Sequence, residues 1–120
     1  MAKFDAPQRV LFVVPGDPDQ NTGGYRYVRR IAEGLNDIGV EASREGLNGV
    51  FPIPDRLAEA SMESLLASLA DGSVVVIDGL AMGALPDVVA VHAGRLRMVA
   101  LVHHPLADET GLAAPTRDWL

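Results

Sequence analysis

The sequence predicts an α/β fold: a Rossmann-like parallel sheet with helices on both of its faces. Residues 10–14 and 74–77 are unbroken runs of apolar, mostly β-branched side chains, which is typical of strands buried on both sides in a parallel sheet. Segments with helical spacing of apolar residues separate these runs. Strands that alternate with helices favour right-handed crossovers, which place helices on both faces of one sheet.

The first strand is followed by a polar turn and then by a helix that opens on two glycines. Gly23 and Gly24 precede apolar residues spaced three and four apart, and this spacing predicts a helix with one apolar face. Thr22 or Asn21 is the expected N-cap, and Gly39 is the expected C-cap. A strand, a glycine turn and a helix N-terminus in this order are typical of an anion-binding site.

The next segments predict an edge strand and a second helix. Residues 40–44 are short and polar, which fits a strand near the edge of the sheet. Asp55 is expected to cap a short turn, and Ser61 to cap the helix proper. Gly34, inside the first helix, suggests close packing of that helix on the sheet, because glycine is otherwise unfavourable there.

The second half of the chain predicts two more strands. Residues 74–77 form a central strand, and residues 80–84 form a connection of small residues. Pro86 fits the first turn of a helix, and residues 98–102 form another buried strand. A loop and the start of a further helix near Thr116 complete the prediction.

Composition places the chain among ordinary globular domains. It has 120 residues, a formal net charge of −6 and no cysteine, so we predict one domain over residues 1–120 and exclude disulfide and thiol chemistry. The lysine and arginine residues do not gather into a basic face, so nucleic acid is not an expected partner. Arg26, Arg29 and Arg30 could meet a phosphate or an anionic membrane surface, but such clusters are more often a solvated helix face. Neither a signal peptide nor a membrane span is recognised, and we expect a cytoplasmic protein.

Polar residues gather at the predicted carboxyl ends of three strands. In an open parallel sheet these ends lie along one edge, where ligands bind. Asp78 is equally well explained as a cap of the next segment, only one of His103 and His104 can face the cleft, and His92 is expected on a solvent-exposed helix face. The strand-end residues are Gly16, Asp17, Asp19, Gly23 and Gly24; Asp78 and Gly79; and His103, His104, Asp108 and Glu109.

Several common ligand motifs are absent. The glycine turn does not match the G-x-G-x-x-G dinucleotide fingerprint, and no G-x-x-x-x-G-K-[ST] phosphate loop occurs. No spacing of histidines and carboxylates matches a known ligand pattern, so we expect no metal.

Three segments resemble the N-terminal half of retaining glycosyltransferases with the GT-B fold. They read T-G-G-Y-x-Y from residue 22, V-V-x-I-D-G-L at 74–80 and L-V-H-H-P-L at 101–106. Bacterial family-four enzymes are the most similar, and the resemblance runs from residue 10 to about residue 112. It implies that this chain is one Rossmann-like half of a two-domain enzyme whose active site lies between the halves.

The resemblance also implies roles for particular residues. Gly23 and Gly24 would lie near the donor diphosphate or the acceptor, and His103 would be the catalytic histidine that approaches the transferred sugar. The co-substrate would be a nucleotide sugar, with no further cofactor. Donor-binding glutamates belong to a C-terminal half that this sequence lacks, so we expect the chain alone to be inactive and to self-associate. The candidate substrate-binding residues are Gly23, Gly24, Tyr25, Asp78, His104 and Glu109.

A phospho-acceptor receiver domain is the alternative interpretation. Asp78 would be phosphorylated, and Asp17 and Asp19 would hold magnesium. Two observations weigh against this: the acids follow Pro15-Gly16 instead of ending the strand directly, and Lys3 is the only lysine.

Overall fold

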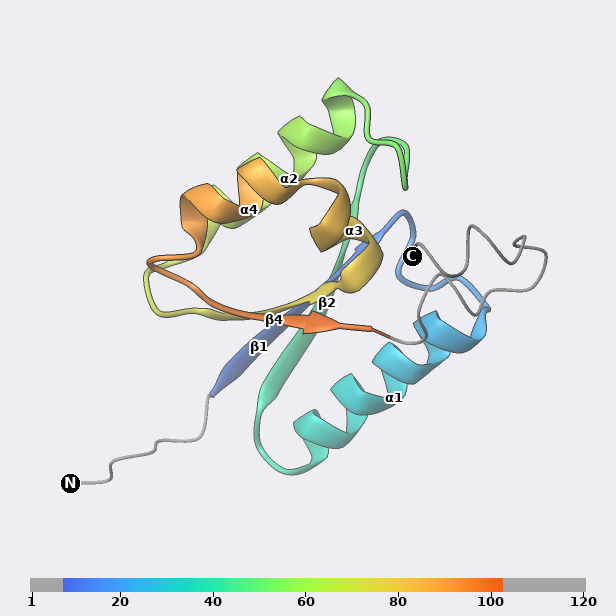
Figure 1. The fold of residues 1–120 in the computed structure, drawn as a ribbon. Helices are drawn as coiled ribbons and strands as arrows, with labels where there is room; N and C mark the ends of the chain where they lie inside the picture. The colour runs from blue at the N-terminus through green and yellow to red at the C-terminus, as the bar shows by residue number, and fades with distance from the viewer. Residues whose placement is uncertain (1–7, 103–120) are drawn as a thin grey trace.

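The computed structural model describes residues 8–102, which form four parallel strands and four helices. The strands lie in the order β2-β1-β3-β4, with the two long apolar runs in the centre. This arrangement (Figure 1) confirms the predicted α/β class and the parallel sheet. The strands are β1 (Arg9–Pro15), β2 (Glu41–Leu47), β3 (Val74–Asp78) and β4 (Arg97–Leu101).

Helices cover both faces of the sheet, as predicted. Figure 1 shows α1 (Gly23–Asp37) on one side, and α2 (Arg56–Ser68) with α4 (Pro86–His92) on the other. The short helix α3 (Gly79–Ala84) follows β3 directly, where the sequence predicted only a connection. No helix within residues 8–102 is long and apolar enough to cross a membrane.

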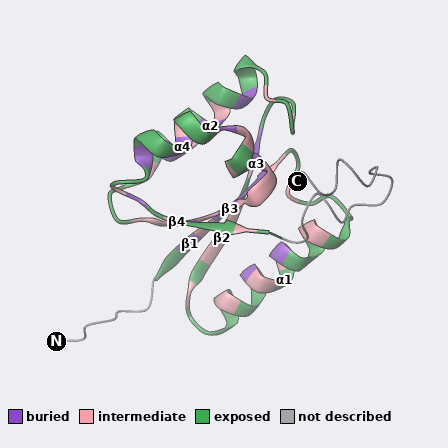
Figure 2. Ribbon diagram, viewed as in Figure 1, coloured by how far each residue is buried: buried purple, intermediate pink, exposed green. Residues whose placement is uncertain are grey.

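Two apolar cores share the central strands, because successive side chains of a strand point to opposite faces. Phe12 of β1 belongs to the core beneath α1, together with Val28 and Ala32 of that helix. Val13 belongs to the core beneath α2, together with Met62 and Leu66. In Figure 2 the buried stretches of α1 lie on the side of the helix that faces the sheet.

The predicted N-cap of α1 is confirmed, the predicted C-cap is off by one residue, and the role assigned to the internal glycine is wrong. Thr22 is the N-cap residue, and Ile38 is the C-cap. Gly39 follows the C-cap with φ 92°, a left-handed conformation that suits glycine just after a helix. A Cβ on Gly34 would meet nothing within 4 Å. Gly34 is therefore not a point of close packing on the sheet.

Helix α2 begins earlier than predicted. Asp55 caps the whole helix by accepting a hydrogen bond from the Ala58 amide at 2.9 Å. Ser61 lies inside the helix, and its hydroxyl instead accepts a hydrogen bond from the Asn48 amide at 3.0 Å. Residues 45–47 lie beyond the predicted strand 40–44, and they continue β2 because they pair with the end of β1.

The prediction of β4 as a buried strand is wrong. β4 pairs with β3 alone among the described residues, and it is an edge of the sheet. Val99 at its centre keeps half of its surface exposed. β2 is the other edge, as its polar sequence predicted.

Candidate functional site

The connections that follow β1 and β3 run to opposite faces of the sheet. The segment after β1 leads to α1 on one face, and the segment after β3 leads to the helices on the other face. The carboxyl ends of two such neighbouring strands leave a crevice, which is the usual ligand site in open α/β sheets. A pocket of about 360 Å³ lies there. Its lining residues are Pro15, Gly16, Gln20, Tyr25, Gly49, Phe51, Asp78 and Leu80.

Tyr25 connects α1 to the end of β1. Its hydroxyl donates a hydrogen bond to the Pro15 carbonyl. Partial burial raises the pKa of Tyr25, and the negative charge of Asp78 raises it further, while a hydrogen bond with Gln20 opposes the shift. The phenol therefore stays neutral at the mouth of the pocket.

Asp78 is both a helix cap and a pocket residue. Its carboxylate accepts a hydrogen bond from the Leu80 amide at 2.9 Å and so caps α3. Asp78 is also the one charged side chain among the eight residues that line the pocket. The predicted capping role of Asp78 is confirmed, and its role in substrate binding stays a prediction. Its charge gives the pocket a negative potential.

The N-terminus of α1 lies beside this pocket, because Tyr25 belongs to its first turn. The Thr22 side chain makes no capping hydrogen bond, and the first turn contains no acidic residue. No carboxylate of the first turn itself offsets the positive end of the helix dipole. A shallow hollow of about 270 Å³ lies over this turn, lined by Gly23, Arg26, Tyr27 and Arg30.

The acidic residues after β1 stabilise their own loop. Asp17 accepts a hydrogen bond from the Asp19 amide at 2.8 Å. Asp19 pairs at 3.0 Å with Arg44, whose guanidinium also donates to the Pro18 carbonyl at 2.9 Å. Within residues 8–102 no three acids or histidines form a group that could hold a metal ion. These contacts give Asp17 and Asp19 a structural role.

The structure brings together some of the predicted site residues. Tyr25 and Asp78 line one pocket, and Gly23 and Gly24 form the turn of α1 just before Tyr25. The remaining predictions, His103, His104 and Glu109, lie outside the described residues.

Several residues of the pocket were not predicted from the sequence, among them Phe51 and Gln20. Phe51 lies in the loop after β2, about 26 residues from its neighbour Tyr25, and Gln20 lies in the turn before α1. Neither belongs to a motif. Loops that follow parallel strands gather at the carboxyl edge of the sheet, so membership of such a loop is the signal that could have indicated them.

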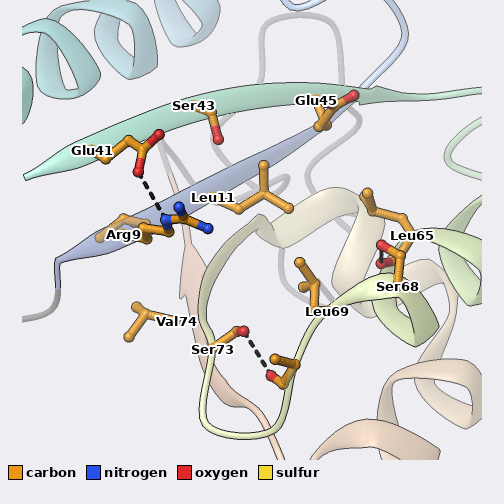
Figure 3. A pocket seen from close by; sticks show the side chains of 12 residues that line it. Arg9, Leu11, Glu41, Ser43, Glu45, Leu65, Ser68, Leu69, Ser73 and Val74 are labelled. Carbon is orange, nitrogen blue, oxygen red and sulfur yellow. Dashed lines mark hydrogen bonds and ion pairs between the residues drawn. The ribbon is translucent and has the colours of Figure 1, made fainter.

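A larger hollow of about 520 Å³ lies at the opposite end of the strands, between β2, the start of β1 and the end of α2 (Figure 3). Its floor contains Leu11, Leu65 and Leu69, and an exposed ion pair of 2.8 Å between Arg9 and Glu41 lies at its rim. α2 does not cover this part of β2, where the side chains are polar. We regard this hollow as a gap between an edge strand and a helix.

His92 is not the solvent-exposed residue that the sequence predicted. Only 6% of it is exposed, and its Nε2 lies 2.9 Å from a carboxylate oxygen of Glu63 in α2. The Arg95 guanidinium donates to Nδ1 at 3.0 Å, so Nδ1 is the acceptor and Nε2 carries the proton. Arg95 also donates to the carbonyls of Leu66 and Leu69 at 2.7 and 2.6 Å. His92 therefore joins α4 to the end of α2.

Comparison of the chain with protein-family models, with curated proteins and with solved structures finds no match. The fold and the pocket define its class: a Rossmann-like α/β protein with a candidate ligand site where the strand order reverses. A more specific function is a matter of proposal.

Proposed function

We propose that this chain is one half of a retaining glycosyltransferase, which acts with a donor-binding half to transfer a sugar from a nucleotide sugar to an acceptor hydroxyl. One observation carries the proposal. The N-terminus of α1 begins with two glycines and receives no capping hydrogen bond from the Thr22 side chain. It lies beside a pocket formed by the carboxyl ends of β1 and β3. The motif resemblance described above supplies the reaction type.

The two parts of the site suit different groups of the substrates. Amides of the first turn of α1 and the nearby Arg26 and Arg30 favour an anion, such as the diphosphate that leaves the sugar. Asp78 makes the neighbouring pocket unfavourable for a phosphate but favourable for a hydroxyl donor. We therefore assign the diphosphate to the helix terminus and the acceptor hydroxyl to the pocket.

During transfer the bond between the anomeric carbon and the diphosphate oxygen breaks. The acceptor oxygen forms the new bond to the anomeric carbon, and its proton passes to the leaving diphosphate oxygen. Negative charge grows on the diphosphate and positive charge grows on the sugar ring. The helix dipole stabilises the first, and a carboxylate such as Asp78 stabilises the second. His103, two residues after β4 in the sequence, is the proposed catalytic residue that contacts the sugar.

Pyrophosphate binding to the ¹⁵N-labelled chain tests the helix terminus, because pyrophosphate reproduces the anionic part of the donor. We expect saturable shifts of the Gly23, Gly24 and Tyr25 amides. Thr22→Asp should weaken binding about tenfold, since its carboxylate competes for the same amides. The same substitution should leave the thermal stability unchanged or raise it, because aspartate is a good N-cap.

Ala60→Asp is the matched control, because it adds the same charge at an exposed position of α2, which lies on the other side of the sheet from α1. It should leave the affinity for pyrophosphate unchanged. Equal weakening by both variants would show that only net charge matters, and the proposed site would then be wrong. Absence of shifts at the first turn of α1 in the unmodified chain would likewise contradict the proposal.

A further inference from the structure

The two edges of the sheet differ in charge. Three of the seven residues of β2 are charged, namely Glu41, Arg44 and Glu45. β4 contains one charged residue, Arg97, at its start, and the remainder reads Met-Val-Ala-Leu. Charged side chains protect an edge strand against pairing with another chain, so β2 is protected and β4 is not.

The unprotected edge also exposes apolar side chains. Val99 is 50% exposed, and Val102, directly after the strand, is 62% exposed. No strand pairs with the outer side of β4 among residues 8–102. The outer side of β4 thus offers backbone groups and valine side chains together, which is the combination that strand addition uses.

We propose that β4 is the dimer interface of this protein, where it pairs antiparallel with β4 of a second copy about a two-fold axis at Val99. The two sheets then form one continuous sheet of eight strands. A two-fold axis requires one surface that is complementary to itself, and β4 meets this requirement because none of residues 98–101 is charged. Val99 faces Val99 of the second copy, which gives a favourable cross-strand pair.

Charge favours a second copy of this chain over an unrelated strand. With Val99 opposite itself, Arg97 lies opposite Leu101 of the second copy, and Leu101 is aligned with Asp78 on β3. Arg97, Leu101 and Asp78 share the sheet face that carries α1, because Leu101 packs in that core and Asp78 lies beside Tyr25.

Asp78 of the second copy then lies two strands away from Arg97. The backbones of these two residues are about 10 Å apart. Extended arginine and aspartate side chains together cover that distance. The one charged residue of β4 therefore meets an opposite charge, and it does so twice in the symmetric dimer. This matters because two copies of net charge −6 otherwise repel each other.

The absence of cysteine makes the register directly testable by single-cysteine variants. In the proposed dimer the two residues at position 99 are directly opposite, at a separation that a disulfide can bridge. Val99→Cys should therefore give a disulfide-linked dimer under mild oxidation. Arg97→Cys should not, because the two copies of residue 97 are about 13 Å apart along the strands. Ser43→Cys, an exposed position on β2, is the control for random collision.

Sedimentation of the full chain provides the second measurement. The unmodified chain should be dimeric, Val99→Lys should be monomeric, and Ser43→Lys should remain dimeric, with circular dichroism showing that each variant is folded. A monomeric unmodified chain whose Val99→Cys variant does not cross-link would overturn the proposal. Equal cross-linking at positions 99, 97 and 43 would also overturn it, since this result indicates unspecific association.

Discussion

Gly46 lies against the backbone of the turn that follows β1. A Cβ placed on Gly46 would lie 2.0 Å from the carbonyl oxygen of Gly16, and real atoms cannot approach so closely. The Gly16 amide donates to the Leu47 carbonyl at 2.8 Å, which ties the turn after β1 to the end of β2. Because Gly16 also lines the pocket, glycine at position 46 helps to shape the candidate site.

Gly46→Ala and Gly34→Ala should therefore change stability in opposite directions. Gly46→Ala should lower the free energy of unfolding by about 2–4 kcal/mol, since backbone must move to admit the methyl group. Gly34→Ala should raise it by about 0.5–1 kcal/mol, because the position is an exposed helix interior with free space. Urea denaturation measures both, and equal effects of the two substitutions would contradict this explanation.

At the scale of one element, α2 depends on Asp55. The Asp55 carboxylate accepts hydrogen bonds from two amides, Ala58 at 2.9 Å in the helix and Val50 at 3.1 Å in the preceding loop. The Ala58 bond, followed by the Val50 bond, lowers the pKa of Asp55 from its ordinary value of 3.8. The same side chain thus starts the helix and holds the loop that carries Phe51 to the pocket.

The stabilisation by Asp55 should depend on pH. Because the folded state lowers this pKa, the contribution is present above pH 3.8 and is lost as the pH falls below that value. At neutral pH, Asp55→Ala should lower the midpoint of thermal unfolding by a few degrees. The difference between Asp55→Ala and the unmodified chain should shrink below pH 3.8.

Asp55→Asn is the matched control, because asparagine is also a good N-cap but does not titrate. The difference in stability between the Asn and Ala variants should be independent of pH. A constant difference between the Ala variant and the unmodified chain down to pH 2 would show that the charge of Asp55 is unimportant.

At the scale of the whole molecule, the two cores depend on the same sheet. β1 sends Phe12 into one core and Val13 into the other, and both residues are buried. Separate loss of either helix layer would expose an apolar face of the sheet to water, which costs free energy in proportion to its area. The described part of the chain should therefore unfold as one cooperative unit.

Substitutions on opposite faces should thus affect a single transition. Leu66→Ala, in the core beneath α2, should lower the free energy of unfolding by about 3 kcal/mol. Val28→Ala, in the core beneath α1, should lower it by about 2 kcal/mol. Circular dichroism and calorimetry should report the same midpoint for each variant. Two separate transitions in either variant would contradict a single domain.

The sequence alone determined the four strands, the helices α1, α2 and α4 apart from some of their ends, the fold class and the edge of the sheet where a site is expected. Strand and helix signals are local, because they depend on the spacing of apolar residues a few positions apart. The rule that parallel strands converge at their carboxyl ends placed Gly16 and Asp78 at one edge, and both residues line the same pocket. The assignment to a glycosyltransferase stays a prediction.

Only the tertiary structure decided what depends on contacts between distant residues. The apolar sequence of β4 resembles that of a buried strand, yet its position at the edge exposes it. His92 is buried because Glu63 and Arg95 satisfy both of its ring nitrogens, and no pattern around His92 indicates those partners. The need for glycine at position 46 and the place of Phe51 in the pocket likewise arise where two loops meet. Which strand ends at an edge, and which polar group finds a partner, are properties of the assembled sheet and its helices.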